Sequence, residues 1–277
     1  MPFTAKSGKF NASINTVEFG TGDKAVKIGG ENVFPLYSFD AAIENAPKVG
    51  IEITDFGMEH EPECIKKYYE GCATLADMAR KAASMEGVDF LSFRMEGGDP
   101  NGANKSTEEL IGELKEIADA VDLPLVVCGC KNVEKDAELF SKAAEALNGK
   151  NAVILSAKEE NYKTVGAAAG LAYKQIVGAE SAVDINLAKQ LNVLISQLGV
   201  DSKSVVMNVG SAAVGYGFEY VISTMDRVKA AALQQGDANL QMPIITPVAS
   251  EAWGVKEAMA SETDAPDSLR VRTPPQI

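Results

Sequence analysis

The chain alternates short apolar runs with longer stretches of helical periodicity, and this alternation constrains its fold more than any other feature. The apolar runs have the length and composition of buried strands, and they cover residues 49–54, 88–93, 124–128, 152–156, 175–178, 204–208 and 243–247. Strands that are apolar on both faces and separated by helices form parallel sheets. Seven to eight such repeats predict an α/β fold of the (β/α)8 TIM type, with ligands at the C-terminal ends of the strands.

Four stripes of apolar residues, spaced three or four positions apart, predict amphipathic helices between these strands. They are Leu110, Leu114, Ile117 and Val121; Leu139, Ala143 and Leu147; Leu187, Leu191, Leu194 and Leu198; and Phe218, Val221, Ile222, Met225 and Val228.

The predicted organisation has three parts. Residues 1–47 form an N-terminal extension with a hairpin at 13–19 and 24–28, residues 48–260 form the barrel, and residues 261–277 form an irregular tail. The tail contains no apolar strand and no terminal helix, so the eighth strand–helix unit is missing or altered at the C-terminus. A seven-stranded barrel leaves two unpaired parallel edges. A fragmentary chain, an altered reading frame at its end, or a partner subunit that covers the gap would each account for this.

Composition limits the classes of partner and compartment. The 277 residues, 46% of them hydrophobic, can bury a large core. A formal net charge of −13 argues against nucleic acids and anionic membranes as partners. No apolar run approaches the ~18 residues of a membrane span, and no secretory segment follows Met1, so we expect a cytoplasmic protein.

The turn that follows the second strand has the composition of a ligand-binding loop. Residues 97–104 hold three glycines and several polar side chains, and Ser106 and Glu109 have the spacing of a capping box that opens a helix. Asp99, Asn101, Gly102 and Asn104 are therefore candidate binding residues. Asp99 and Asn104 have an alternative role, which is only to stabilise the turn.

Other strand ends add polar residues to the same predicted rim. They include Glu52, Thr54 and Asp55; Arg94 and Glu96; Gly129, Cys130 and Asn132; Ser156 and Lys158; Asp184 and Asn186; and Asn208 and Gly210. Asn208 is a candidate binding residue, whereas Asp184 is better explained as a helix N-cap. Gly215 and Tyr216 begin a Gly-Tyr-Gly turn that forms either an anion-binding nest or a plain turn.

Histidine and cysteine content restricts metal chemistry. His60 is the single histidine, so sites that need two histidines, such as common zinc-hydrolase centres, are excluded. Four cysteines, Cys64, Cys72, Cys128 and Cys130, equal the number of thiolates that hold an iron–sulfur cluster. Their spacing lacks the usual Cys-x-x-Cys runs. We therefore predict free buried thiols and no cluster in this chain, with Cys128 and Cys130 on the same side of a strand.

Several motifs in a fixed order resemble a known family. They are Gly-Gly-Asp-Pro-Asn-Gly-Ala-Asn at 97–104, Leu-Val-Val-Cys-Gly-Cys at 125–130, Val-Glu-Lys-Asp at 133–136, Glu-Glu-Asn-Tyr-Lys at 159–163, Asp-Ile-Asn-Leu-Ala-Lys-Gln-Leu-Asn at 184–192, Gly-Tyr-Gly-Phe-Glu-Tyr at 215–220 and Glu-Ala-Trp at 251–253. Together they resemble the small, delta-type subunit of the corrinoid iron–sulfur protein of the carbon monoxide dehydrogenase/acetyl-CoA synthase system.

This resemblance implies a methyl carrier of the reductive acetyl-CoA (Wood–Ljungdahl) pathway of anaerobes. The implied partner is a large subunit that holds the corrinoid (cobalamin), with its cobalt, and an iron–sulfur cluster, and the small subunit caps the corrinoid in a heterodimer. A methyltetrahydrofolate methyltransferase would supply the methyl group, and acetyl-CoA synthase would receive it. The chain itself would be non-catalytic and hold no metal.

Two other functions stay open at this stage. A pterin-dependent methyltransferase has a similar barrel, in which Asn208, Asp99 and Asn186 would orient the pterin. A purely architectural subunit would hold the complex together without touching the cofactor.

Overall fold

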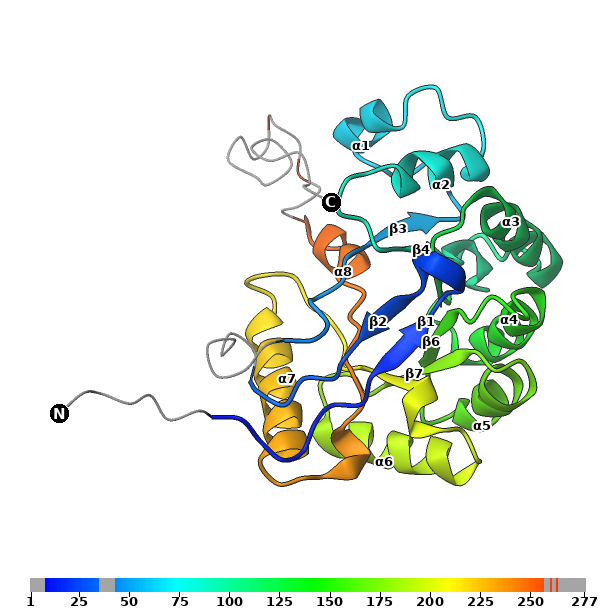
Figure 1. Ribbon diagram of the computed structural model, residues 1–277. Coiled ribbons are helices and arrows are strands. Elements are labelled where there is room, and N and C mark those ends of the chain that lie inside the picture. The colour runs from blue at the N-terminus through cyan, green and yellow to red at the C-terminus, as the bar shows by residue number, and fades with distance from the viewer. Residues whose placement is uncertain (1–7, 35–42, 257–259, 261–262, 264–277) are drawn as a thin grey trace.

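The computed structural model describes residues 8–34, 43–256, 260 and 263, and its centre is a six-stranded parallel sheet. The strands are β3 (Gly50–Thr54), β4 (Phe90–Arg94), β5 (Leu125–Cys128), β6 (Val153–Ala157), β7 (Ile176–Glu180) and β8 (Val205–Asn208). Each strand pairs with its neighbour in chain order, and helices connect consecutive strands (Figure 1). Sequential parallel strands with helical crossovers have the topology of a TIM-type barrel, which confirms the predicted fold class.

The helices cover the outside of the sheet. They are α1 (Glu63–Tyr68) and α2 (Leu75–Ala83) after β3, α3 (Thr107–Ala120) after β4, α4 (Val133–Ala146) after β5, α5 (Tyr162–Val165) with the π-helical stretch Gly166–Ala172 after β6, α6 (Ile185–Gln197) after β7, α7 (Phe218–Leu233) after β8, and the short α8 (Ala249–Trp253). Short 3-10 turns lie at Gly22–Lys24, Glu96–Gly98, Ser202–Ser204 and Ala238–Leu240.

The apolar stripes of α3 and α4 face the sheet as predicted, but those of α6 and α7 do so only in part. On α6 the buried face is Ala188, Leu191, Asn192 and Ile195, whereas the predicted Leu187, Leu194 and Leu198 are only half-buried. Leu110, Leu114 and Ile117 of α3 are fully buried. Ile222 was predicted to belong to the buried stripe of α7 but is 45% exposed. It lies about 100° around the helix from the buried Val221, at 3.6 residues per turn, and so points away from the sheet.

Side chains alternate between two cores. Those that point out from the sheet pack beneath the helices, and those that point into the barrel form a smaller cluster that includes Val126, Cys128, Leu155 and Val206. Cys130, beyond the end of β5, belongs to the outer core, so the prediction that it shares a side with Cys128 was wrong. The strand ends at Cys128, and the backbone turns immediately afterwards, with Lys131 at φ +70°.

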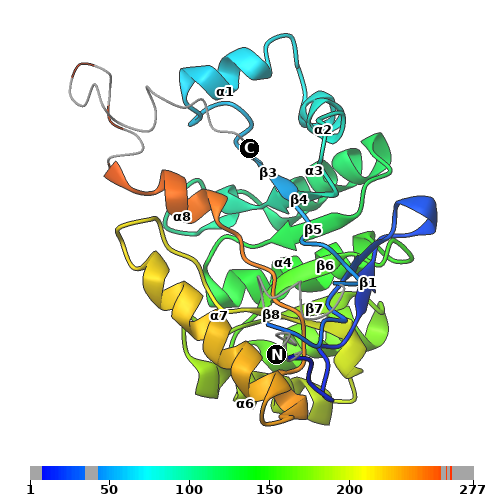
Figure 2. The ribbon, with the colours of Figure 1, turned by 60° about the vertical axis from the view of Figure 1, so that its left-hand side comes forward.

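A hairpin covers the barrel interior at the N-terminal ends of the strands. Strands β1 (Val17–Phe19) and β2 (Val26–Ile28) pair antiparallel, which confirms the predicted hairpin in a shorter form. Val17, Phe19 and Val26 pack into the inner core. Asn151, before β6, donates from Nδ2 to the Glu18 carbonyl at 2.9 Å. Figure 2 shows the hairpin at one end of the strands and α8 at the other.

The seventh predicted strand forms only one parallel bridge. Residues 243–247 contribute the pair Met207–Ile244, in which the Met207 amide donates to the Pro243 carbonyl at 2.8 Å and the Ile245 amide donates to the Met207 carbonyl at 2.9 Å. Pro243 and Pro247 have no N–H to extend the ladder. The segment therefore lies in the place of a seventh strand without forming one.

The sheet does not close within the described part of the chain, where β3 pairs only with β4. A cavity of about 1330 Å3 lies between β3 and residues 243–249. We call this space the seam cavity. Ile51, Met78 and Ile244 are among the apolar residues that line it. The predicted irregular tail at 261–277 lies outside the described residues apart from Thr263.

Candidate functional site

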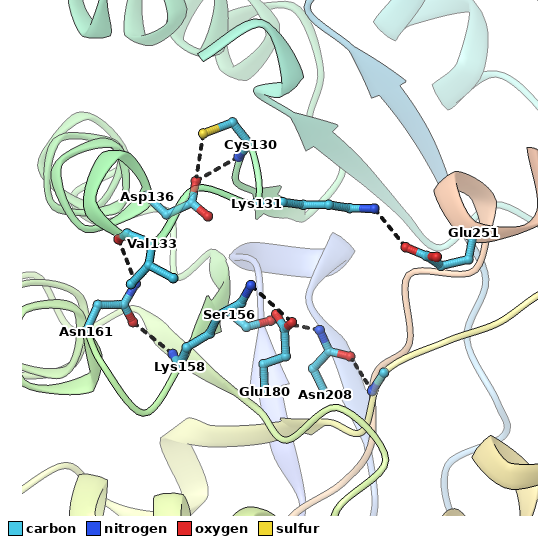
Figure 3. A network of polar contacts seen from close by, with 11 residues as sticks. Cys130, Lys131, Val133, Asp136, Ser156, Lys158, Asn161, Glu180, Asn208 and Glu251 are labelled. Carbon is cyan, nitrogen blue, oxygen red and sulfur yellow. Dashed lines mark hydrogen bonds and ion pairs between the residues drawn. The ribbon is translucent and has the colours of Figure 1, made fainter. Parts of the chain in front are cut away.

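A second, polar cavity of about 160 Å3 lies at the C-terminal ends of β4 to β8. We call it the mouth pocket. Its polar lining includes Arg94, Asp136, Ser156, Lys158, Glu180 and Asn208. Because the carboxyl ends of parallel strands converge at one end of a barrel, side chains that are distant in the sequence come together there. Figure 3 shows most of this network.

Asn208 holds the centre of the mouth pocket. Its side chain is 4% exposed, its Nδ2 donates to Ser156 Oγ at 2.9 Å, and its Oδ1 accepts from the Gly210 amide at 3.0 Å. Both ends of the amide are thus bonded within the protein. This fixes the orientation of the side chain at the end of β8 and leaves the Ser156 hydroxyl proton available as a donor.

A lysine–glutamate pair crosses the floor of the pocket. Lys158 Nζ lies 3.4 Å from Glu180 Oε1, and both side chains are about a quarter exposed. The Lys158 backbone is held by Asn161, whose Oδ1 accepts the Lys158 amide at 2.8 Å and whose Nδ2 donates to the Val133 carbonyl at 3.2 Å (Figure 3). The pair therefore presents both a donor and an acceptor from a fixed backbone.

Asp136 anchors the loop after β5. Its Oδ1 accepts from the Cys130 amide at 2.7 Å and from Cys130 Sγ at 3.2 Å. Burial raises the pKa of Asp136, although these hydrogen bonds oppose the effect, and burial also raises the pKa of the Cys130 thiol to about 12. Gly129 is required here, because an added Cβ would lie 2.2 Å from Asp136 Oδ1. A thiol held protonated in this way is a weak nucleophile and a weak metal ligand.

A buried ion pair separates the mouth pocket from the seam cavity. Arg94 Nε and Nη2 donate to the two carboxylate oxygens of Glu52, each at 2.9 Å, and the side chains are only 7% and 10% exposed. Arg94 lines both spaces, and Glu52 lines the seam cavity. This bidentate geometry fixes the guanidinium plane at the junction of the two cavities.

Asp55, which follows β3, binds the start of the turn after β4. Its carboxylate accepts the Gly97 amide at 2.9 and 3.1 Å, and Lys105 Nζ lies 3.0 Å from its Oδ2. Lys105 also donates to Glu113 at 3.2 Å. The start of the 97–104 turn is therefore fixed by a buried carboxylate that sequence reasoning placed only in the general rim.

The four candidate residues of this turn lie together on the surface. Asp99 Oδ1 accepts from the Asn101 amide at 3.0 Å and from its Nδ2 at 3.2 Å, and the Asp99 carbonyl accepts from Gly102 and Asn104. These bonds give Asp99 the turn-stabilising role that the sequence left as an alternative. Asp99 also lines the seam cavity, while Asn101, Gly102 and Asn104 are exposed. The ligand role of the four residues stays a prediction.

The remaining candidates lie in the loop before α7. Gly215 and Tyr216 are exposed, and Gly217, at φ +109°, is the N-cap of α7. Val214, Tyr216 and Tyr220 are 82%, 57% and 66% exposed, so this loop and the first turn of α7 place apolar side chains near the barrel mouth. Asn208 is inside the mouth pocket and is not in one cluster with the surface turn.

Two pocket residues escaped the sequence analysis. Glu180 is the last residue of β7, but the predicted strand stopped at residue 178. Asp136 is in the first turn of α4, where an acidic residue is ordinary. An extension of the apolar run 175–178 by two residues would have found Glu180. Asp136 ends the Val-Glu-Lys-Asp motif of the family resemblance, but that motif did not mark it as a pocket residue.

The next residues to place are the cysteines and the single histidine, which the sequence analysis considered as metal ligands. Cys128 and Cys130 are free, buried thiols, as predicted, and Cys72 is free and half-buried. Within the described ranges, no group of three or more His, Cys, Asp or Glu side chains has the arrangement of a metal site. His60 stacks edge-on against Phe56, with ring centroids 4.8 Å apart. The described helices include none that is long and apolar enough to cross a membrane.

Comparison with known proteins establishes the family. A family model described as the CO dehydrogenase/acetyl-CoA synthase delta subunit matches residues 16–266. The chain belongs to this family. It is 32% identical over 251 residues to the acetyl-CoA decarbonylase/synthase complex subunit delta of Methanothermobacter thermautotrophicus. That alignment covers 90% of this chain and 63% of the relative. The subunit of the same name from Methanopyrus kandleri is 33% identical over 240 residues, covering 86% of this chain and 59% of its own length.

The chain thus spans about three fifths of the length of these curated relatives. Among solved structures, a mandelate racemase/muconate lactonizing protein from Herpetosiphon aurantiacus aligns with a TM-score of 0.45 and 15% identity, over 78% of this chain and 50% of that one. The fold assignment rests on the strand order of this chain and not on that alignment.

Proposed function

We propose that this chain is the small subunit of a corrinoid iron–sulfur methyl carrier, and that its barrel mouth caps a corrinoid held by a larger partner. The proposal rests on the delta-subunit family assignment together with the character of the mouth. The described residues of that mouth offer hydrogen-bonding groups that are held in place by contacts within the protein. The proposed route runs from methyltetrahydrofolate, through a separate methyltransferase, to acetyl-CoA synthase.

The described residues fit a corrinoid cap in two ways. Corrin side chains carry amides, and the mouth pocket presents both donors and acceptors, among them Ser156, Lys158 and Glu180. The nearby exposed apolar side chains Val214, Tyr216 and Tyr220 would exclude water around a ring. When bound, the corrinoid supplies a reactive cobalt centre, and the protein's part is to position and shield it.

The same residues argue that another subunit holds the cobalt. His60, the one histidine of the chain, lies in the loop after β3, stacked on Phe56, and the mouth pocket contains no histidine. The Cys130 thiol in the adjoining loop has a pKa raised to about 12 by burial. A side chain that could serve as the principal axial ligand is therefore lacking at the described mouth.

Catalysis by a pterin-dependent methyltransferase is less well supported. In such an enzyme Asn208 would hydrogen-bond the substrate, but its Nδ2 and Oδ1 are both bonded to the protein here. Asn186 lies in the first turn of α6, where its backbone amide donates to Asp184. Asp99 is engaged in its own turn.

Co-purification tests the proposal. The chain expressed alone should be colourless, whereas the same chain co-expressed with a large corrinoid-binding subunit should elute as a heterodimer with corrinoid and iron–sulfur absorbance. A stoichiometric corrinoid on the isolated chain would contradict the assignment of the cofactor to the partner. Methylation of free cobalamin from methyltetrahydrofolate by the chain alone would favour the methyltransferase instead.

Paired variants separate a cap from a purely architectural subunit. Asn101→Ala, on the exposed turn, should leave heterodimer formation intact and slow methyl transfer by the complex several-fold. Asn148→Ala is the matched control, because Asn148 is also exposed but follows α4 at the opposite end of the barrel. Unchanged transfer in the Asn101 variant, and in Tyr216→Ala as a second variant, would support the architectural role and refute the cap.

A further inference from the structure

The mouth pocket is lined by hydroxyl groups that still have hydrogen-bonding capacity. The side chain of Ser156, a residue that is 4% exposed, accepts from Asn208 Nδ2, and no described residue accepts its proton. Ser211 also lines the pocket, and its Oγ is buried without a hydrogen-bond partner among the described residues. Buried polar atoms are normally hydrogen-bonded, so these two hydroxyl groups beside one cavity indicate a site for a polar ligand.

The charges of the pocket are balanced within the protein. Among the described residues, each cation that lines the pocket already has a carboxylate partner. The pairs are Arg94–Glu52 at 2.9 Å, Lys131–Glu251 at 2.8 Å and Lys158–Glu180 at 3.4 Å. Asp136 also lines the pocket and forms no ion pair with another described residue. Three cations and four carboxyl groups give this set a formal charge of −1.

This balance disfavours a charged ligand of either sign. A carboxylate finds no free cation, and it has to displace Glu180 in order to bind Lys158. An ammonium or amidinium ligand meets three positive charges, and the Asp136 carboxylate already accepts two hydrogen bonds from Cys130. An uncharged ligand avoids both penalties. The pocket therefore fits a neutral group that can accept from Lys158 and donate to Glu180 at the same time.

We propose that the mouth pocket is a subsite for a primary carboxamide, and that the Lys158–Glu180 pair makes it selective against the corresponding carboxylate. A primary amide carries an acceptor oxygen and two N–H donors on adjacent atoms, which matches a lysine and a glutamate held side by side. The volume of about 160 Å3 admits one such group with a few water molecules of ~30 Å3 each. The natural ligand rests on the proposed function: it is a side-chain amide of the corrin, and the pocket distinguishes an amidated corrin from one that carries acids.

Isosteric ligands that differ only in charge test the subsite. Acetamide, acetate and acetamidinium are titrated into the isotope-labelled full chain while NMR follows the backbone amides of Gly210 and Ser211, which line the pocket. Acetamide should shift both amides with a dissociation constant of about 1–30 mM, as expected for so small a ligand. Acetate and acetamidinium should bind at least about 10-fold more weakly, because each brings a charge that finds no free partner.

Two variants of the ion pair should change this preference in opposite directions. Glu180→Gln keeps the shape of the side chain but frees Lys158, so acetate should bind about 10-fold more tightly than to the parent and should overtake acetamide. Lys158→Met leaves Glu180 without its cation, so the preference should shift toward acetamidinium. Glu160→Gln is the matched control, because Glu160 is exposed after β6 and does not line the pocket. The control should keep the preference for acetamide.

The titrations have outcomes that contradict the subsite. Tighter binding of acetate or acetamidinium than of acetamide to the parent chain, or no saturable shift with acetamide, would overturn it. An unchanged order of the three ligands in both pocket variants would overturn the selective role of the ion pair. Circular dichroism establishes that each variant is folded, and if one variant unfolds, the parent titration and the other variant decide.

Reconstitution of the heterodimer tests the corrin as the source of the amide. The heterodimer is loaded either with cobalamin or with a corrinoid whose side-chain amides are hydrolysed to carboxylates, and gel filtration measures the corrinoid absorbance that it retains. The parent should retain cobalamin with at least about 5-fold preference, and the Glu180→Gln heterodimer should lose most of that preference. Equal preference in the two heterodimers would overturn the corrin amide as ligand. Failure to retain either corrinoid would contradict the proposed function itself, whereas the acetamide titration uses no corrinoid and tests the pocket independently.

Discussion

The buried pair Glu52–Arg94 gives the sharpest test of how this barrel is stabilised. Two hydrogen bonds of 2.9 Å join the side chains, which are 10% and 7% exposed. In Glu52→Gln the shape of the side chain is kept, but the guanidinium loses its counter-charge. A buried charge without a partner costs about 3–5 kcal/mol. We expect the low end, about 3 kcal/mol, because both side chains border a large cavity that can admit water.

Urea unfolding followed by circular dichroism measures this cost. With a slope of about 2–3 kcal/mol per molar urea, a loss of 3 kcal/mol lowers the midpoint by about 1–1.5 M. Glu116→Gln on the exposed face of α3 is the matched control and should change the midpoint by less than about 0.2 M.

A double replacement tests the physical reason. The E52L/R94M variant removes both charges and supplies apolar side chains, and buried pairs replaced in this way often lose little stability. We therefore expect the double variant to be at least about 2 kcal/mol more stable than the sum of the single changes Glu52→Leu and Arg94→Met predicts. A midpoint for Glu52→Gln within 0.3 M of the parent, or strict additivity in the double variant, would refute the reasoning.

Three further predictions follow from the described contacts. Gln175→Ala should lower the free energy of unfolding by about 2–4 kcal/mol in a urea titration, because the fully buried side chain accepts from the Ala152 amide at 2.6 Å and donates to two carbonyls; a loss below about 1 kcal/mol would contradict this. Asp184→Ala should lower the free energy of unfolding by about 1 kcal/mol through loss of the α6 N-cap, while Asp184→Asn should keep most of the capping stability. Equal losses in the two variants would count against a capping role. Burial raises the pKa values of Cys128 and Cys130 to about 11 and 12, so unfolding releases thiol protons above pH 9 and stability should fall between about pH 9 and 12; a C128A/C130A variant that keeps the full decline would show that other groups cause it.

The cysteines also bear on what a labelling experiment should find. Both thiols are protonated at neutral pH and lie in packed cores. They should resist iodoacetamide in the native protein at pH 8 and react at once in urea.

Local sequence signals determined much of this molecule. Six of the seven predicted strands form within about two residues of the expected bounds, because each apolar run fills a place that is buried on both faces. The N-cap at Asp184 forms as expected, since a side-chain oxygen next to free helix amides needs no distant partner. Ser106 caps α3 by accepting from the Glu109 amide, which is one half of the expected capping box. The hairpin and the free thiols at Cys128 and Cys130 were equally accessible from local pattern and spacing.

Tertiary structure decided the site and the closure. The contacts of Lys158 with Glu180 and of Asn208 with Ser156 depend on where separate strand ends converge, and no spacing within the chain encodes that convergence. The 243–247 segment is apolar enough for a strand but makes one bridge, because Pro243 and Pro247 lack the amides that would extend the ladder. Sequence alone therefore set the repeats, whereas the packing of those repeats around a shared axis determined which polar groups meet and where the sheet stays open.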